Sequence, residues 1–235
     1  MRAFALSGGT PAGFLHQVKS LVNFMAKSKS LSGSGYFPLE FNPVLTCKSW
    51  TEFSSVTSNC QACPLRKTRT QVVQGRYHPA PEADLLILGE GPGEVEDLKG
   101  KAFVGDSGKL LDIMLNSVGL DSFYITNAVR CRPPNNRTPS KAEIQKCLLF
   151  LKTEIALVKP KAILCLGKIA AKTLIDVRGK FEKSIGCRHQ YFEYPVWLAY
   201  HPAYLLREPQ LSEHSPKWVT WQVLSQVKLY LDRNC

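Results

Sequence analysis

The sequence predicts an α/β fold in which helices cover both faces of a parallel sheet. Four short apolar runs have the length and composition of buried strands: "ADLLILG" (83–89), "FYITNAV" (123–129), "KAILCLG" (161–167) and "VWLAYH" (196–201). Periodic helical stretches lie between these runs. Strands that alternate with helices along a chain are typical of a parallel sheet with both faces covered.

The helical stretches are marked by their caps and their apolar sides. Ser140 and Glu143 form a capping box, and the helix that they begin continues to Lys159, where the following proline ends it. A second helix begins near Ser107 and carries leucines and a methionine on one side. The segment "WVTWQVLSQVKLYL" (218–231) predicts a final helix that packs on the domain.

Length, charge and cysteine content limit the class of protein. The chain has 235 residues, 44% of them hydrophobic, which is enough for one main domain. A formal net charge of +11 favours a polyanionic partner. No apolar run approaches the roughly 18 residues that cross a bilayer, so we expect no membrane partner. Eight cysteines are too few for a disulfide scaffold, which favours a reducing compartment.

The first 46 residues differ in composition from the rest of the chain. Four cations precede the first acid, Glu40, and the run "SKSLSGSG" is typical of a flexible joint. We therefore expect a flexible or partly helical extension over 1–46 and a folded domain over 47–235. Because "FLHQVKSLVNFM" predicts an amphipathic helix, organellar targeting by the extension is the alternative.

A glycine-rich turn, "GEGPGEVED" (89–97), follows the first predicted strand. Glu94 stands where a dinucleotide fingerprint needs its third glycine, and Gly108-Lys109 is not followed by the Ser or Thr of a Walker loop. Pro92 removes a backbone donor, and the four acids of the turn would repel a phosphate. The turn predicts a site for a neutral group close to backbone, with a plain strand-to-helix turn as the alternative.

Polar residues follow three of the four predicted strands. Glu90 follows the first strand, Asn127 lies near the end of the second, and His201 ends the fourth. In open parallel sheets ligands bind outside the carboxyl ends of the strands. These three side chains are therefore expected to form one site.

Four cysteines have a spacing that indicates a metal site. Cys60 and Cys63 form a C-x-x-C pair, Cys131 follows the second predicted strand, and Cys147 lies inside the helix that Ser140 caps. Structural zinc sites usually combine two C-x-x-C pairs, whereas one pair with two distant cysteines is more typical of an iron–sulfur ligand set. Zinc remains the alternative.

An ordered set of motifs runs from Cys60 to Trp218: "CQACPL", "RTQVVQG", "GEGPGEVED", "GKAFVGDSGKLLD", "YITNAVRCRPPNNRTPS" with Cys147 downstream, "PKAILCLGKIAA" and "HPAYLLR". In this order the motifs closely resemble the family 4 uracil-DNA glycosylases, the iron–sulfur branch of the uracil-DNA glycosylase superfamily. The resemblance implies a three-layer α/β/α sandwich around a central four-stranded parallel sheet. It also implies a 4Fe-4S cluster on Cys60, Cys63, Cys131 and Cys147.

The resemblance implies a base-excision repair glycosylase. Such an enzyme flips uracil out of DNA, hydrolyses its N-glycosidic bond and leaves an abasic site without cutting the strand. The implied partners are uracil-containing DNA and downstream abasic-site repair enzymes, and the protein is expected to act as a monomer. In a bacterium it would lie in the cytoplasm, at the nucleoid.

Three residues match family positions that hold the flipped base. Phe103 would stack on uracil, and the amide of Asn127 would pair with uracil N3–H and O4 while rejecting the reversed edge of cytosine. An N–H of His201 would stabilise the negative charge that develops on uracil O2. The alternatives are a core phenylalanine, a turn-capping asparagine and a structural histidine.

The water-activating group is less clearly marked. Other branches of the superfamily have Asp or Asn at the position of Gly91. This chain has glycine there, as the family 4 enzymes do. We expect Glu90 and the backbone of Gly91 to position the water, with Glu96 supporting them or lining the pocket near uracil C5. The alternative is that Glu90 and Glu96 are charged side chains of a solvated loop.

Contacts with DNA are expected from two loops. Arg130, Arg132 and Arg137 of "RCRPPNNR" would lie beside the cluster and contact phosphates. In "HPAYLLREP" the apolar side chains would fill the gap left by the flipped base, with a cation on phosphate. The residues of this second loop are Tyr204, Leu205, Leu206 and Arg207.

Two functions of other classes compete with the glycosylase. The first is a noncatalytic nucleic-acid-binding module that keeps the fold and cluster as a scaffold. Phe103, Asn127 and His201 argue against it, since binding a DNA backbone needs none of them. The second is a metal-dependent hydrolase, which the five scattered histidines disfavour.

Overall fold

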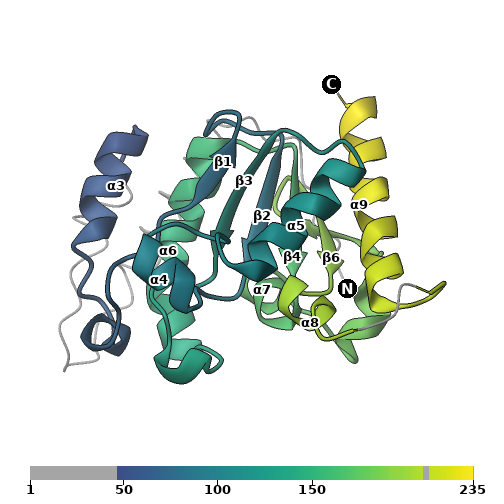
Figure 1. Cartoon of the computed structure of the whole chain (residues 1–235). Helices are drawn as coiled ribbons and strands as arrows, with labels where there is room; N and C mark the ends of the chain where they lie inside the picture. Colours follow the sequence, from purple (N-terminus) through teal and green to yellow (C-terminus); the bar gives the residue numbers. More distant parts are fainter. Residues whose placement is uncertain (1–46, 209–211, 235) are drawn as a thin grey trace, which may run out of the picture. The chain divides into compact units, whose positions relative to one another are not determined.

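The computed structural model describes residues 47–208 and 212–234, so the expected extension over 1–46 lies outside the described residues. The described strands form one six-stranded sheet in the order β1-β3-β2-β4-β6-β5 (Figure 1). Their bounds are β1 (Arg76–His78), β2 (Leu85–Gly89), β3 (Phe123–Asn127), β4 (Ala162–Leu166), β5 (Arg188–Tyr191) and β6 (Tyr194–Ala199).

Helices alternate with the inner strands along the chain, as predicted. The α-helices are α3 (Trp50–Ser58), α4 (Glu94–Lys99), α5 (Asp106–Ser117), α6 (Lys141–Val158), α7 (Lys168–Leu174), α8 (Pro202–Leu205) and α9 (Pro216–Arg233). Short 3-10 turns are η2 (Pro64–Lys67), η3 (Pro134–Asn136) and η4 (Phe181–Ser184). Within the described ranges, no helix is both long enough and apolar enough to span a membrane.

The four inner strands run parallel, which confirms the predicted parallel sheet. β2 pairs with β3 on one side and with β4 on the other, and β4 pairs with β6. Every residue of β2, β3 and β4 is buried. Because both faces of these strands are covered, they are continuous apolar runs rather than alternating ones.

The expected count of four strands was incomplete, because an antiparallel strand extends the sheet at each edge. β1 pairs with β3, and β5 pairs with β6, both antiparallel. Both strands are short and polar, and most of their residues are partly or fully exposed. Edge strands of this kind lack the apolar signal by which the inner strands are recognised.

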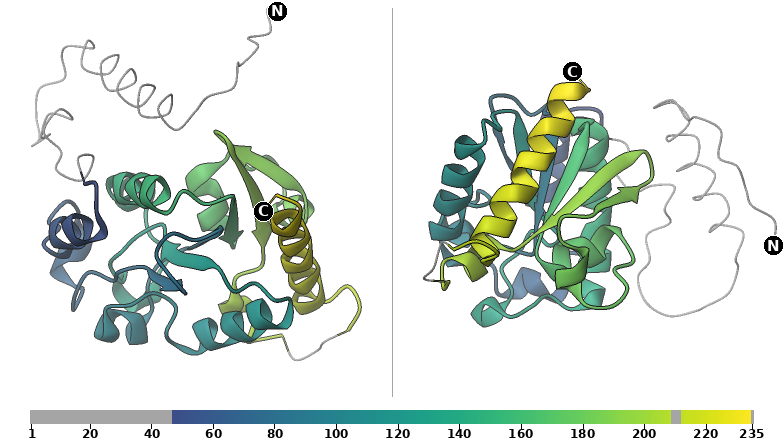
Figure 2. Two further views of the ribbon diagram at one scale, coloured as in Figure 1. Left: turned by 90° about the horizontal axis from the view of Figure 1, so that it is seen from above. Right: turned by 90° about the vertical axis from the view of Figure 1, so that its right-hand side faces the viewer.

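The sheet lies between two layers of helices, which confirms the three-layer sandwich (Figure 2). Alternate residues of the inner strands, such as Ile87 and Leu164, pack with the buried sides of α5 and α9. The intervening residues, such as Leu86 and Ile163, pack with α6 and α7. The alternation follows from the period of two along each strand.

The order of the strands places a crevice at the carboxyl edge of the sheet. The chain leaves β2 toward α4 and α5 on one face, whereas it leaves the neighbouring β4 toward α7 on the other face. Ligands of open α/β sheets bind where adjacent strands diverge in this way. The loops after β2, β3 and β6 meet at this edge.

The start of α6 fixes one of these loops. The Ser140 hydroxyl accepts from the Glu143 backbone N–H (3.2 Å), and the Glu143 carboxylate accepts from the Ser140 N–H (2.7 Å). This confirms the capping box predicted from the sequence. The helix ends at Val158, where Lys159 adopts a left-handed conformation before Pro160.

Candidate active site

A cavity of about 620 Å³ opens at the carboxyl edge of the sheet. Its walls include the turn after β2, the loop before α5, the end of β3 and the start of α8. It is lined by Glu90 after β2, by Asn127 at the end of β3 and by His201 after β6. The cavity is the size of a small-molecule site, and polar groups converge on it from several elements.

Phe103 forms a flat apolar wall of the cavity. Its side chain is buried, and its ring lies 5.7 Å from that of His201, centroid to centroid. The backbone of Phe103 has a left-handed conformation (φ 52°), which is strained for a bulky residue. A side chain at Gly108 would collide with the Phe103 carbonyl, so the first turn of α5 holds this backbone in place.

Asn127, the last residue of β3, presents an unused acceptor. The residue is 5% exposed, and among the described residues its Oδ1 has no hydrogen-bond partner. A buried polar atom left without a partner costs about 1 to 3 kcal/mol. A Cβ at Gly89 would collide with this oxygen and lie 2.6 Å from the Phe103 ring, so glycine leaves room for both side chains. The cavity is therefore prepared for a ligand that donates an N–H.

His201 is held as a neutral donor. The backbone N–H of Ala203 donates to its Nδ1 (3.1 Å), which places the ring proton on Nε2. Burial lowers the pKa of His201 to about 4, and the charge of Arg207 acts in the same direction, against a smaller opposite effect of Glu96. At neutral pH the imidazole is uncharged and has one N–H available to the cavity.

Glu90 lines the cavity directly after β2 and is half-buried. Burial raises the pKa of its carboxyl, while a hydrogen bond from the Thr138 side chain lowers it. Gly91 follows at the same wall, where a Cβ would lie 3.0 Å from the Val129 side chain. An acid and an open stretch of backbone are therefore adjacent at one wall of the cavity.

Glu96 lines the cavity from α4, and its carboxylate ties two loops together. Oε1 accepts from the backbone N–H groups of Val104 (3.0 Å) and Gly105 (2.7 Å), and Oε2 accepts from that of Gly93 (3.1 Å). The alternative that Glu96 is a solvated loop charge does not describe it, because the residue is 9% exposed. Its bonds link the turn after β2 to the loop that carries Phe103.

The arginines of the loop after β3 differ in their surroundings. Arg130 is 2% exposed and turned into the domain, so its expected contact with DNA was wrong. Arg132 donates to Asn136 (2.8 Å) and lies 3.3 Å from the Glu94 carboxylate. Arg137 binds both carboxylate oxygens of Glu143 (2.9 and 2.7 Å), with its side chain half exposed. That Arg132 and Arg137 contact phosphates stays a prediction.

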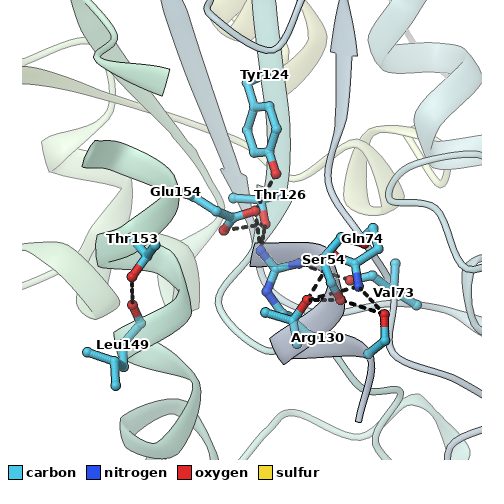
Figure 3. Close-up of polar contacts among 11 residues, drawn as sticks. Ser54, Val73, Gln74, Tyr124, Thr126, Arg130, Leu149, Thr153 and Glu154 are labelled. Atoms are coloured by element: carbon cyan, nitrogen blue, oxygen red, sulfur yellow. Dashed lines mark hydrogen bonds and ion pairs between the residues drawn. The ribbon is translucent and has the colours of Figure 1, made fainter. Parts of the chain in front are cut away.

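Arg130 is the centre of a buried polar network (Figure 3). It forms an ion pair with Glu154 of α6, and the Tyr124 hydroxyl donates to the same carboxylate (2.5 Å). The neighbouring sequence gave no sign of this inward orientation, because Glu154 lies 24 residues further along the chain. The network is therefore a feature that sequence reasoning missed.

The loop after His201 presents two of its three apolar side chains. Tyr204 and Leu206 line the cavity and are partly exposed, and Arg207 lies beside them. Leu205 is completely buried in the core, so the expectation that it enters DNA was wrong. One turn of α8 forces this outcome, because adjacent residues of a helix face different sides.

The four predicted ligand cysteines lie near one another. Cys131 and Cys147 are buried, and Cys60 and Cys63 are partly exposed. The pKa of Cys147 is raised to about 12, mainly by burial, with Arg130 acting against this rise and the neighbouring Cys131 and Cys63 adding to it. Within the described part of the chain, no group of three or more His, Cys, Asp or Glu could hold a single metal ion.

Arg69 is a neighbour of the cysteines that the motifs did not single out. It donates to the Cys131 Sγ (3.2 Å) and to the Cys60 carbonyl (2.7 Å). Hydrogen bonds to ligand sulfurs orient them and adjust their charge. The position of Arg69, six residues after Cys63 in a basic segment, is the one signal in the sequence.

The fold and the cavity define a doubly wound α/β protein with a ligand site at the carboxyl edge of its sheet. The family model of the uracil DNA glycosylase superfamily matches residues 76–225. The chain is 39% identical over 165 residues to a type-4 uracil-DNA glycosylase of Archaeoglobus fulgidus, covering 66% of this chain and 82% of that protein. A type-4 enzyme of Thermotoga maritima is 39% identical over 164 residues, with coverages of 66% and 81%.

The relationship to a type-5 uracil-DNA glycosylase of Pyrobaculum aerophilum is weaker, at 28% identity over 202 residues. That match covers 68% of this chain and 85% of the relative. The chain belongs to the uracil-DNA glycosylase superfamily, and specifically to its type-4 family. This confirms the resemblance carried by the sequence motifs.

Proposed function

We propose that this protein excises uracil from DNA in base-excision repair and that the cavity beside Phe103 and Asn127 receives the flipped base. The observation that carries the assignment to this cavity is the Oδ1 of Asn127, which has no hydrogen-bond partner in the part of the chain that the structure describes and lies next to a flat aromatic wall. Uracil N3–H donates to Oδ1, and the amide N–H of Asn127 donates to uracil O4. Cytosine has an acceptor at N3 and a donor at N4, so it meets both groups with the wrong polarity.

His201 stabilises the leaving base. As the glycosidic bond breaks, negative charge develops on uracil O2, and the Nε2–H donates to it. One such preorganised donor lowers a barrier by about 3 to 4 kcal/mol in comparable sites. A neutral imidazole suits this role because it donates a hydrogen bond without needing a proton from solution.

The water that attacks the sugar is held at the wall formed by Glu90 and Gly91. The half-buried carboxylate of Glu90 accepts a proton from the water, and the backbone of Gly91, which lines the same cavity, helps to position the water. Thr138 holds Glu90 by its side chain. Glu96 acts through the loops that it ties together rather than through the water.

Flipping a base costs a few kcal/mol, which contacts with the DNA must offset. Leu206, which is about half exposed, and Tyr204 enter the space that the base has left. Arg207, Arg132 and Arg137 contact phosphates around the flipped nucleotide. The protein binds uracil-containing DNA as a monomer and hands its abasic product to downstream repair enzymes; in a bacterium this takes place in the cytoplasm.

Four cysteine side chains fit a 4Fe-4S cluster better than zinc. A zinc ion with Zn–S bonds of about 2.3 Å holds its sulfurs roughly 3.8 Å apart, whereas a cluster binds each cysteine at a separate iron corner. The Cys60 and Cys63 thiols are close enough to raise the pKa of Cys131, and Cys63 and Cys131 are close enough to raise that of Cys147, whereas no group that could hold a single metal ion occurs among the described residues. Cys60, Cys63, Cys131 and Cys147 would hold the cluster.

When bound, the cluster supplies iron–sulfur bonds that join the segment around Cys60 to the loop after β3 and to α6. Arg69 already donates to one of the sulfurs. The chemistry at uracil is carried by Asn127, His201 and Glu90. The cluster is therefore proposed as a structural cofactor.

Release of free uracil from an oligonucleotide with one uracil tests the function, on anaerobically purified protein whose iron content is measured in the same sample. Expected are iron in the protein and alkali-labile breaks at uracil alone. Asn127→Ala is the matched variant, since it removes the pairing group at a position where a smaller side chain leaves the fold intact. Iron-loaded protein that binds DNA without releasing base would contradict the proposal and favour a noncatalytic scaffold.

A further inference from the structure

Arg130 lies between the two parts of the site, three residues after Asn127 and directly before Cys131. Its guanidinium pairs with Glu154, and both side chains are almost completely buried (Figure 3). Removing two charges from water offsets most of their attraction, so a buried ion pair is weak evidence for stability. The ion pair between Arg130 and Glu154 is better explained by a role in holding neighbouring side chains and loops in position.

On one side, the network holds the strand that ends in Asn127. Thr126 donates to Glu154 (3.0 Å) and accepts from Arg130 (3.5 Å), and the hydroxyl of Tyr124 donates to Glu154 (2.5 Å). Burial and the charge of Glu154 raise the pKa of Tyr124, which keeps its phenol protonated as a donor. Asn127 is the next residue after Thr126 and points to the opposite face, toward the cavity.

On the other side, Arg130 touches the elements that carry the cysteines. Its guanidinium lies over the Phe53 ring of α3 (5.1 Å) and near the ring of Phe150 (6.0 Å), which is one turn of α6 after Cys147. It also donates to the Val73 carbonyl (3.1 Å). These contacts join α3, α6 and the segment before β1 around one side chain.

We propose that Arg130 is a positioning residue that couples the cysteine site to the recognition of uracil. Its ion pair with Glu154 fixes the short turn between Asn127 and Cys131, so neither end of the turn moves without the other. Coupling between two sites is reciprocal. Bound uracil therefore slows loss of the cluster, and loss of the cluster weakens the binding of uracil. The inference rests on the proposed function.

The test compares the full-length wild type with Arg130→Lys. Loss of iron to a chelator is followed by the visible absorbance of the cluster, with and without excess free uracil. KM and kcat are measured on an oligonucleotide with one uracil. In the wild type, uracil is expected to slow iron loss severalfold. In Arg130→Lys, iron loss is at least tenfold faster and the protection by uracil disappears.

The kinetic constants separate positioning from general damage. Asn127 pairs with uracil in both the ground state and the transition state, so its misplacement raises KM. His201 lies at the start of α8, after a different strand, and keeps its place. Arg130→Lys is therefore expected to raise KM at least fivefold with kcat within twofold of the wild type.

Arg69→Lys is the matched control. Arg69 donates to Cys131 and to Cys60, and none of its hydrogen bonds reaches β3. Iron loss is expected to quicken in this variant, while free uracil still protects the iron that remains and KM is unchanged. If Arg69→Lys also lost the protection by uracil, then any damage to the cysteine site would abolish this protection. The coupling would then not depend on Arg130.

If Arg130→Lys does not fold, Tyr124→Phe decides the matter. It removes one donor to Glu154 and leaves the ion pair intact, so it should reduce the protection by uracil at least twofold. Unchanged protection and KM in this variant would overturn the inference. The inference would also be overturned if the wild type is active but loses iron at the same rate with and without uracil. Iron-loaded wild type that releases no uracil would instead overturn the proposed function itself.

Discussion

The protonation state of His201 gives the sharpest prediction from the structure. A solvent-exposed histidine with a pKa of about 6.5 is roughly three-quarters charged at pH 6. His201, with its pKa lowered to about 4 by burial and then by Arg207, should be about 1% charged at the same pH. It should also carry its proton on Nε2, because Nδ1 accepts from the Ala203 backbone.

Nitrogen-15 NMR of histidine-labelled protein measures both properties. The chain has five histidines, and the signals of His201 are those that disappear in His201→Gln. The expected result is an Nε2–H tautomer that does not titrate between pH 8 and pH 5. Arg207→Ala should raise the pKa while leaving it below 6.5, since burial is the larger cause. Titration near 6.5 in the wild type, or an Nδ1–H tautomer, would refute the reasoning.

The same shift predicts how stability depends on pH. Between pH 6.5 and about 4 the unfolded chain binds a proton at residue 201 and the folded chain does not. Stability from this group is therefore fully present above pH 6.5 and falls as the pH drops toward 4. The total is roughly 3 kcal/mol, at about 1.4 kcal/mol for each pH unit between the two pKa values. His201→Gln should lack this part of the pH dependence.

Three further substitutions test the cavity and the DNA contacts. Asn127→Ala should lower kcat/KM for uracil roughly 10- to 100-fold, the effect of about 1.5 to 3 kcal/mol of lost hydrogen bonding; an unchanged value would remove Asn127 from base recognition. Gly89→Ala should abolish most uracil release while the protein still folds by circular dichroism, because its Cβ intrudes on Asn127 and on the Phe103 ring. Arg207→Ala should reduce the slope of log affinity against log salt by about one for uracil-containing DNA. Lys161→Ala at the opposite edge of the sheet should leave that slope as it is.

The parallel core and the position of the cavity could be predicted from the sequence for a physical reason. Inner strands are buried on both faces, so β2 and β4 appear as plain apolar runs. Parallel strands place their carboxyl ends at one edge, which brings Asn127 and His201 to one cavity. The edge strands β1 and β5 could not be predicted, because exposed strands need no apolar residues.

The orientation of neighbouring side chains could not be predicted from the sequence. Arg130 and Arg132 are two residues apart, yet only the first is buried, because Glu154 of another element neutralises it. Leu205 and Leu206 are adjacent and identical, yet one is in the core and the other at the cavity. Such choices depend on partners that are close in space and distant along the chain.

The charges of the cavity explain how a basic protein can bind a neutral base in DNA. Glu90, Glu94 and Glu96 line the cavity, although the chain as a whole has a net charge of +11. We expect these acids to keep phosphates out of the cavity, while Arg207 at the cavity wall would contact a phosphate and the uncharged base would enter. Under the proposed function the same acids would oppose the negative charge that develops on departing uracil, and the neutral N–H of His201 would stabilise that charge locally. Because the pKa of His201 is lowered to about 4, its imidazole would remain a neutral N–H donor over the whole physiological pH range.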